Sequence, residues 1–371
     1  MSRWDEPAPG EREGRDRTWS VVRDAYEERI RVPHKRDWRP IAIAVAVAAV
    51  VAGAVTPPGH AVFGSLRDAV RGERNAAPAL LSLPAPHSRL LVQSREGAWV
   101  VQSDGSKRLL RGYHNAAWSP HGLYLAAVHG NELRALEPNG AVHWSIGRPG
   151  AIRKPRWSFD GYRIAYFAGP TLRMIYGDGT HDRALTRDAR PGVSAWQPAS
   201  HALAYLNRAG NIVIRNVDQP VHFAVIRTGL APRQLQWTRD GRLLVATGSH
   251  GIGVFAQRGP QQRRIDTGVG TIETSALSPD GKHLAFIETR AGQSSLQVTG
   301  TTTGPTREIF KGPGIFSNVV WAPDGRSVLL DWTSADQWLF IHSLPVEKVD
   351  AVSNISADFG KEPSLVGWCC P

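Results

Sequence analysis

Short apolar segments alternate with polar turn segments along the chain from about residue 83 to its end. Clear examples are the segments 162–167, 242–246, 282–287 and 326–332, which are rich in β-branched and aromatic residues. Segments of this length and composition are typical of β-strands. A stretch containing Asp-Gly precedes each of them, and these two residues favour tight turns. The pattern therefore predicts an all-β fold built from repeated hairpins.

The turn stretch recurs as a five-residue cassette that begins with Trp or Leu and, in most copies, ends with Gly. The copies begin at Trp118, Trp157, Trp196, Trp237, Leu277 and Trp321, and the glycines are Gly122, Gly161, Gly241, Gly281 and Gly325. Successive copies start 39, 39, 41, 40 and 44 residues apart. A strand-rich repeat with a period near 40 residues is the signature of a β-propeller. We therefore expect a ring of similar blades.

Each repeat contains a second turn, which divides its remaining residues into two more strands. This turn reads Asp104-Gly105, Asn139-Gly140 and Asp178-Gly179, with a weaker copy at Asp218-Gln219. Asp-Gly and Asn-Gly favour two-residue hairpin turns, and we expect such turns here. Each repeat then supplies four strands, which is the size of one propeller blade.

The number of blades depends on both ends of the repeat array. Residues 83–92 align without gaps on residues 321–330 and form a degraded first repeat, which brings the expected number of blades to seven. The C-terminal segment 363–368 has the form of a strand ending in Trp368, with no hairpin after it. Because an open ring would leave unpaired strand edges, we expect this segment to pair with the first blade. A six-bladed ring is the alternative if residues 83–113 pack differently.

The cassette residues have a structural interpretation. A large side chain at the same point of every blade fills the space between adjacent sheets, and Trp368 would do so where the ring closes. The Asp and Gly of the cassette are explained by turn formation. We therefore expect no catalytic, cofactor-binding or metal-binding role for these residues.

The cassette and the strand after it resemble the TolB-type, WD-like propeller repeats of bacterial envelope proteins. The likeness covers roughly residues 83–371, and a clear copy is Leu277-Ser-Pro-Asp-Gly281 followed by a Leu-Ala-Phe strand. The resemblance implies the fold and leaves the function open, because propellers host many activities. The fourth copy departs from the pattern at Ala199-Ser200, and Phe159 and Arg239 occupy the Pro position. The chain leaves no room before the repeats for the N-terminal domain of TolB, so we do not expect TolB's partners.

An apolar segment precedes the repeats. Residues 41–55 carry no polar side chain, and five basic residues crowd its N-terminal side: Arg29, Arg31, Lys35, Arg36 and Arg39. A spanning helix takes about 20 apolar residues, and basic residues favour the cytoplasmic side. We expect a single-pass transmembrane helix at 40–58, with the N-terminus cytoplasmic, a linker at 59–78 and an extracytoplasmic propeller at 79–371. A secretory signal cleaved near Ala54 is one alternative, and a buried soluble helix is another.

Residues 1–39 form the predicted cytoplasmic arm, which we expect to be partly disordered. Within it, an amphipathic helix at about 18–31 would carry Trp19, Val22, Tyr26 and Ile30 on one face. A lone helix of this length is marginal in water, so its apolar face needs the membrane surface or a protein partner. In layout alone, the arm, span and external domain resemble bacterial membrane-bound anti-sigma proteins. That resemblance implies a transmembrane regulator as an alternative function.

The net charge of the chain and the distribution of its basic residues bear on the class of partner that it could bind. The net charge is +11, and the basic residues are spread through all repeats without a nucleic-acid-binding motif. We therefore expect no nucleic acid as a partner. A protein is the first candidate partner, and an anionic envelope polymer is the second. Nothing in the pattern implies an obligate homo-oligomer.

The sequence contains none of the common catalytic or metal-binding motifs. The closest histidines in the sequence, His114, His121, His129 and His143, lack ligand spacing and are interpreted as surface or turn residues. Cys369 and Cys370 are adjacent and give no long-range crosslink, although a disulfide between chains is an alternative. We therefore predict a non-catalytic interaction or sensing module without a cofactor. A propeller hydrolase or lyase with its site in the channel mouth is the remaining alternative.

Overall fold

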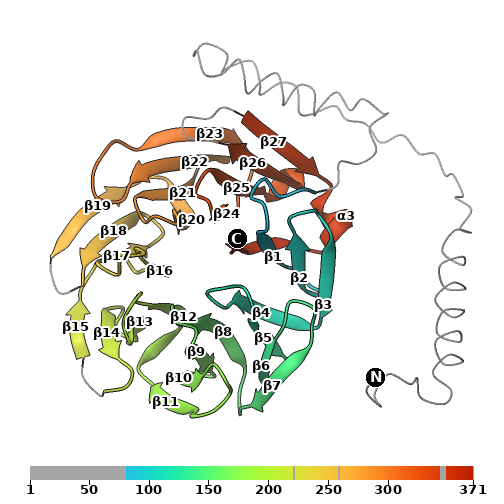
Figure 1. Cartoon of the computed structure of the whole chain (residues 1–371). Helices are drawn as coiled ribbons and strands as arrows, with labels where there is room; N and C mark the ends of the chain where they lie inside the picture. Colours follow the sequence, from blue (N-terminus) through green and yellow to red (C-terminus); the bar gives the residue numbers. More distant parts are fainter. Residues whose placement is uncertain (1–80, 220–221, 258–259, 343–347, 371) are drawn as a thin grey trace, which may run out of the picture. The chain divides into compact units, whose positions relative to one another are not determined.

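The computed structural model describes residues 81–219, 222–257, 260–342 and 348–370. These residues form a ring of seven four-stranded antiparallel sheets, each of which is one blade (Figure 1). The predicted seven-bladed all-β propeller is confirmed. The six-bladed alternative is wrong, because residues 89–111 supply three strands of a complete first blade.

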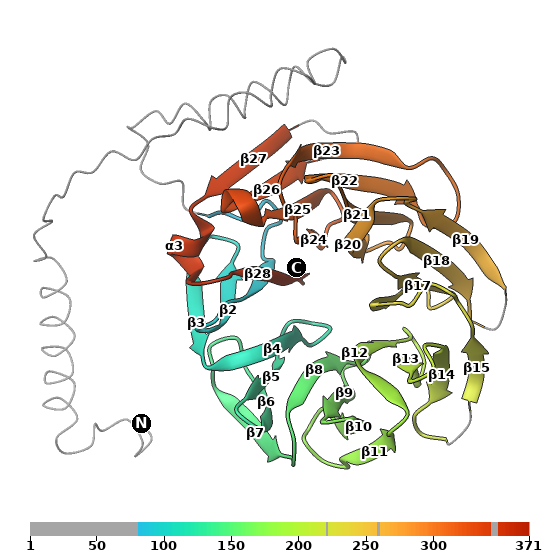
Figure 2. The same ribbon diagram turned by 180° about the vertical axis from the view of Figure 1, so that it is seen from behind.

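Blades 2 to 7 each consist of four consecutive strands, of which the first lies nearest the ring axis in both views (Figures 1 and 2). Blades 2, 3 and 4 contain β4 (Tyr113–Trp118), β5 (Leu125–His129), β6 (Glu132–Leu136) and β7 (Val142–Gly147); β8 (Ile152–Trp157), β9 (Arg163–Ala168), β10 (Thr171–Tyr176) and β11 (Arg183–Thr186); and β12 (Ala189–Trp196), β13 (Ala202–Asn207), β14 (Ile212–Asn216) and β15 (His222–Ile226).

The next three blades repeat this order. Blades 5, 6 and 7 contain β16 (Gln234–Trp237), β17 (Leu243–Thr247), β18 (Gly251–Ala256) and β19 (Gln261–Asp266); β20 (Thr271–Leu277), β21 (His283–Arg290), β22 (Gln293–Gly300) and β23 (Arg307–Pro313); and β24 (Asn318–Trp321), β25 (Ser327–Trp332), β26 (Gln337–His342) and β27 (Lys348–Ser353). A 3₁₀-helix, η2 (Thr333–Ala335), connects β25 to β26, and a short helix, α3 (Ile355–Phe359), follows β27.

Blade 1 joins the two ends of the repeat array. Its sheet has the order β28 (Ser364–Cys369), β1 (Arg89–Gln93), β2 (Gly97–Gln102) and β3 (Lys107–Arg111). In the antiparallel pairing of β28 with β1, Trp368 lies opposite Leu90. The expected closure of the ring by the C-terminal strand is therefore confirmed. Cys369 and Cys370 form a disulfide with each other at the end of β28, which differs from the alternative of a disulfide between chains.

The cassette turns follow from the residues that form them. In blade 3, Asp160 Oδ1 accepts the backbone N–H of Tyr162 at 3.0 Å, and Gly161 adopts a φ of 75°. The degraded first repeat keeps the same conformation, because His87 adopts a φ of 59° at the position of the cassette glycine. The left-handed region is unfavourable for a residue with a Cβ atom, which explains the glycines of the other copies.

The second turns differ from the prediction of two-residue hairpin loops. At Asp178-Gly179 only the glycine has a positive φ, of 86°, whereas the favoured two-residue turn for this dipeptide needs it at both positions. Gly179 N–H donates to the carbonyl of Tyr176, and Tyr176 N–H donates to the carbonyl of Thr180. These bonds define a three-residue loop, a type I turn followed by a bulge, and the prediction was wrong because Asp-Gly suits both geometries.

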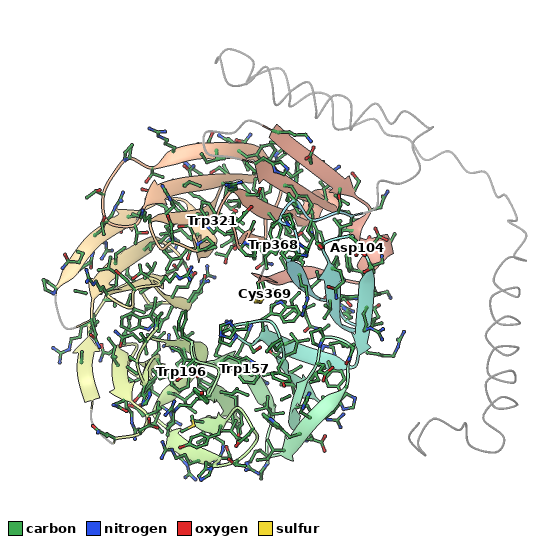
Figure 3. All side chains as sticks on the ribbon, viewed as in Figure 1. Asp104, Trp157, Trp196, Trp321, Trp368 and Cys369 are labelled. Carbon is green, nitrogen blue, oxygen red and sulfur yellow. A yellow bond between two sulfur atoms is a disulfide. The ribbon has the colours of Figure 1, made fainter. Side chains whose placement is uncertain are left out.

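Apolar side chains of neighbouring blades form the core between the sheets. Trp196, at the start of blade 4's cassette, packs in a cluster with Phe167 and Met174 of blade 3. The structure places Trp368 of β28 and the other residues that start a cassette in similar clusters between adjacent blades: Trp118, Trp157, Trp237, Leu277, Trp321 and Trp368. The tryptophans labelled in Figure 3 accordingly lie around the inner part of the ring.

The ring has two faces, which differ in the turns they carry. The turns between the first and second strands, including all the cassettes, emerge on the same face as the turns between the third and fourth strands. We call this the cassette face. The turns between the second and third strands and the connections between blades lie on the opposite face. This division follows from the four-stranded antiparallel order of each blade.

The predicted arm and span lie outside the described residues. They include the segment 40–58 and the arm residues Trp19, Val22, Tyr26 and Ile30. Within the described part of the chain, no helix has the length and apolar character needed to cross a membrane.

Candidate functional site

A groove of about 840 Å³ opens on the cassette face between blades 2 and 3. Its walls come from the cassette turn of blade 3, from Tyr124 just before β5 of blade 2, from the turn between β10 and β11, and from β6 and β7. His201, in the cassette region of blade 4, completes the lining. Concave sites lined by aromatic and a few polar side chains are the usual places for ligands on a protein.

Blade 2 contributes an aromatic wall. The rings of Tyr124 and His143 meet edge to face with centroids 4.7 Å apart. Trp144 on β7 donates its indole N–H to the carbonyl of Gly177 in blade 3 at 2.8 Å. A side chain at Gly179 would clash with the Trp144 ring, since its Cβ would lie 2.8 Å from it. The turn between β10 and β11 therefore rests directly on Trp144.

Blade 3 contributes two carboxylates and two tyrosines. Asp160 and Asp178 line the groove together with Tyr162 and Tyr176. Hydrogen bonds from Thr180, at 2.7 Å from its hydroxyl and 2.9 Å from its N–H, lower the pKa of Asp178. The Asp178 carboxylate is therefore ionised at neutral pH. The Tyr162 side chain is one of the most exposed large apolar groups in the described part of the chain, at 72 %.

The guanidinium of Arg163 also lines the groove, but its charge is balanced by an acidic partner. Arg163 Nη2 lies 2.7 Å from Asp218 Oδ2, and His201 Nδ1 lies 2.5 Å from the same oxygen. The Arg163 guanidinium is also 5.8 Å from the centre of the Tyr176 ring. The protein thus already places one cation over an aromatic ring at this site.

The groove opens at an interface that lacks a hydrogen bond found elsewhere in the ring. Trp196 donates its indole N–H to the carbonyl of Arg156 in the preceding blade at 2.9 Å, and Trp237 and Trp321 make the equivalent bond at 3.2 and 3.0 Å. The indole N–H groups of Trp118 and Trp157 are buried without a partner among the described residues. Both interfaces of blade 2 therefore lack this bond, and one of them holds the groove.

Exposed apolar side chains occur in the segments that line the groove. Of the nine large apolar side chains that are exposed in the described residues, five line the groove or adjoin a residue that does. We call them the apolar patch: Leu123, Tyr124, Val142, Phe159 and Tyr162. Exposed apolar groups that gather in one place mark interaction sites, whereas scattered ones need no explanation.

The apolar patch is not among the site residues predicted from the sequence, although the sequence contains a signal for it. The residue after the fifth cassette position is Leu123, Tyr162 and His201 in blades 2 to 4, but Arg242, Lys282 and Arg326 in blades 5 to 7. Phe159 adds to the contrast, because it replaces the Pro of the regular cassette. Comparing the repeats position by position would have separated the two halves of the ring.

Some of the other candidate residues line the groove, and the rest lie outside it. Among the histidines singled out from the sequence, His143 lines the groove, whereas His114, His121 and His129 do not. Of the cassette residues, Trp157, Asp160 and Gly161 line it. No group of three or more His, Cys, Asp or Glu side chains within the described ranges is arranged to hold a metal ion.

The enzyme alternative predicts a cluster of acidic or His side chains with perturbed pKa values in a cleft. Burial raises the pKa of Asp331 to about 6, although a hydrogen bond from Ser317 opposes the shift. Asp331 lies on β25 and is not part of the groove. In the groove itself, the pKa of Asp178 is lowered rather than raised. An ionised carboxylate suits the binding of a cation better than it suits proton donation.

No protein-family model matches this chain, and no curated protein matches it. Solved structures share its fold. Hsv2 from Kluyveromyces marxianus superposes with a TM-score of 0.55 at 14 % identity, covering 71 % of this chain and 93 % of that chain. Kluyveromyces lactis Hsv2p gives 0.52 at 16 % identity, covering 69 % and 90 %. The propeller domain of Cps50 (Swd1) from Myceliophthora thermophila gives 0.53 at 13 % identity, covering 66 % and 86 %. At these identities the likeness shows the propeller fold alone.

Proposed function

We propose that this protein is a non-catalytic interaction module, anchored in a membrane, whose propeller binds a protein partner outside the cytoplasm. The binding surface is the apolar patch together with the groove. Propellers offer a rigid disc on which loops can vary, so a binding surface needs changes only in the turns. The cassette turns of blades 2 and 3 differ from those of blades 5 to 7 in this way.

The observation that carries the proposal is the gathering of exposed aromatic and aliphatic side chains at one place. Leu123 is 62 % exposed and Phe159 is 50 % exposed, and both sit in cassette turns that elsewhere hold Pro, Lys or Arg. Tyrosine and phenylalanine are enriched at the centres of protein interfaces, where Lys is depleted. A partner that covers these side chains would remove apolar surface from water, which favours association.

The membrane anchor is supported by the apolar segment 41–55 and by the basic residues before it. In this proposal the arm at 1–39 stays in the cytoplasm and the propeller faces the other compartment. Alkaline extraction of native membranes tests the anchor. The full-length protein should remain in the membrane pellet, and recovery of the full-length chain in the soluble fraction would contradict it.

The binding surface is tested with a photoreactive amino acid in the full-length protein, in its native membranes. p-Benzoylphenylalanine replaces Leu123 in the patch or, as a control, Ile315 in the connection between blades 6 and 7 on the opposite face. Both side chains are exposed, at 62 % and 56 %. We expect a crosslinked adduct of defined mass from position 123 and none from position 315.

A second substitution makes the test specific. Tyr162→Ser should reduce the adduct at least about fivefold, because truncating a central aromatic side chain typically weakens an interface by more than about 1 kcal/mol. Val269→Ser, on the opposite face and 75 % exposed, should leave it unchanged. Equal adducts from both faces, or insensitivity to Tyr162→Ser, would contradict the proposed surface.

A further inference from the structure

The groove combines aromatic rings with carboxylates in a chain whose net charge is +11. Tyr124, Trp144 and Tyr162 supply the rings, and Asp160 and Asp178 supply the carboxylates. Aromatic faces attract cations through their quadrupole, and a carboxylate adds a charge-assisted hydrogen bond. The groove is therefore lined by the kinds of side chain that bind cations, although the protein as a whole is positively charged.

Each carboxylate keeps acceptor capacity. Asp178 Oδ1 accepts both bonds from Thr180, and Asp178 Oδ2 accepts none from the described residues. Asp160 Oδ1 accepts the hydroxyl of Ser158 and the N–H of Tyr162, whereas Oδ2 faces only the Arg163 guanidinium at the long distance of 3.4 Å. A carboxylate oxygen has room for two donors, so both groups can accept further bonds from a ligand.

The basic groups of the groove do not cancel this charge. Arg163 is the only Lys or Arg among the groove residues, and its partner Asp218 at 2.7 Å is shared with Arg183 at 3.3 Å. The carboxylates of Asp160, Asp178 and Asp218 still outnumber these two guanidiniums by one. His143 is paired with Glu137 at 3.1 Å. The groove therefore presents a net negative charge, and the placement of Arg163 over Tyr176 is an example within the protein of the contact that a bound cation would make.

We infer that the groove binds the side chain of an arginine or lysine that the protein partner supplies. This inference rests on the proposed function and names the chemistry of the recognised group. A cationic side chain on a peptide fits the site because the apolar patch lies next to the carboxylates. The patch would cover the apolar residues that flank the basic one, while the groove takes its charged end.

The inference is tested with labelled peptides and the full-length protein in detergent, by fluorescence anisotropy. The probes are nonapeptides of Gly, Ser and Leu with one central residue, which is Arg, Lys, citrulline or norleucine. Citrulline keeps the shape of arginine without its charge. We expect the Arg and Lys peptides to bind at least about tenfold more tightly than the citrulline and norleucine peptides, which corresponds to about 1.4 kcal/mol.

The repeats supply matched controls. Asp178→Asn should weaken the Arg peptide about fivefold or more, a change of the size expected for a charge-assisted hydrogen bond. Asp104→Asn alters the equivalent turn of blade 1, where Asp104 accepts the Ser106 N–H at 2.9 Å, and should have no effect. Asp240→Asn is the matching control for Asp160→Asn. In the wild type, the Asp240 carboxylate accepts the Thr238 hydroxyl at 2.6 Å and the Arg242 N–H at 3.0 Å.

Three results would overturn the inference. They are equal binding of Arg and citrulline peptides, equal effects of Asp178→Asn and Asp104→Asn, and no binding of any peptide by a folded protein. If the crosslink from position 123 persists in these cases, the interaction surface stands and the cation site fails. If the crosslink is absent while the Arg peptide binds with the expected selectivity, the proposed protein partner fails and the cation site stands.

Discussion

Trp368 donates its indole N–H to the hydroxyl of Ser88 at 2.8 Å, across a separation of 280 residues. Both side chains are buried, and the bond joins the last strand of the chain to the turn that precedes β1. The ring of Trp368 also meets Phe340 of blade 7 edge to face, with centroids 5.8 Å apart. One residue therefore connects blade 1 to blade 7 and helps to close the ring.

Removing this bond should cost about 1 kcal/mol of unfolding free energy, the typical contribution of one buried hydrogen bond. Trp368→Phe removes it while leaving most of the packing. Ser88→Ala removes it together with the bond from the Ser88 hydroxyl to the carbonyl of Ala85 at 2.6 Å, so it should cost more than Trp368→Phe. Trp368→Ala should cost about 3–5 kcal/mol because it also leaves a cavity. Urea denaturation measures these values. The double variant Ser88→Ala/Trp368→Phe should lose less than the sum of its single changes, and strict additivity would show that the two residues act independently.

Asp182 connects blades 2 and 3 through a buried carboxylate. It accepts bonds from Arg148 at 2.7 Å, from Arg173 at 2.6 Å and from the hydroxyl of Tyr166 at 2.6 Å. Asp182→Asn should lower the unfolding free energy at pH 7 by about 2–3 kcal/mol. This loss of unfolding free energy is smaller than the loss expected for breaking a fully buried ion pair, because both guanidiniums are partly exposed. Asp266→Asn, which removes an exposed partner of Arg264, should cost less than about 0.5 kcal/mol.

The stabilisation that Asp182 provides should depend on pH. Burial alone would raise the pKa of Asp182, but hydrogen bonds from Arg173, Tyr166 and Arg148 outweigh it and lower the pKa. The stabilisation is therefore present above the unfolded pKa and lost as the pH falls through the folded pKa. The difference between wild type and Asp182→Asn should shrink as the pH is lowered below about 4. A constant difference down to pH 2 would contradict the role given to the charge.

The repeated turns show how far the sequence could lead. The period, the strands and the turn at Gly161 follow from local preferences that act within a few residues, and all were predictable. The turn at Gly179 was not, because Asp-Gly is compatible with two loop geometries. In the structure this turn contacts Trp144, which belongs to another blade. Local sequence carries no information about that contact.

The groove was not predictable for a related reason. The identity of Tyr162 and Leu123 can be read from the repeats, but the space between blades 2 and 3 depends on packing between strands far apart in the sequence. The missing indole bond of Trp157 belongs to this packing. Trp157 and Trp196 look equivalent in the sequence, and only the arrangement of the blades distinguishes them.

The first repeat offers a change that should stabilise the protein. His87 is exposed and has a φ of 59°, whereas the corresponding glycines have φ values from 64° to 75°. His87→Gly should raise the unfolding free energy by about 0.5–1 kcal/mol, because relief of the left-handed strain exceeds the entropy that glycine adds to the unfolded chain. The reverse change, Gly241→Ala, should destabilise the protein, since its Cβ would lie 2.8 Å from the carbonyl oxygen of Pro198. Thermal denaturation of both variants checks the sign, and a lower midpoint for His87→Gly would refute the argument.

Asp331 should make the propeller less stable as the pH rises. The side chain is 4 % exposed, and burial raises its pKa to about 6 from an ordinary value of 3.8. Because the folded pKa is higher than the unfolded one, the protonated carboxyl is favoured in the fold. Its contribution to stability is complete below about pH 4 and is lost as the pH rises through about 6.

Asp331→Asn keeps the shape of the side chain and removes its titration. Between pH 4 and pH 7.5, the unfolding free energy of the wild type should therefore fall relative to that of Asp331→Asn by up to about 3 kcal/mol, since one pKa unit corresponds to about 1.36 kcal/mol. Urea denaturation at a series of pH values measures the difference, in which the contributions of other groups cancel. Ser317→Ala removes the hydroxyl that donates to Asp331 Oδ2 at 2.8 Å and should move the loss of stability to a higher pH range, because the remaining carboxylate is stabilised less. Parallel pH profiles for wild type and Asp331→Asn would show that this carboxyl does not titrate near pH 6.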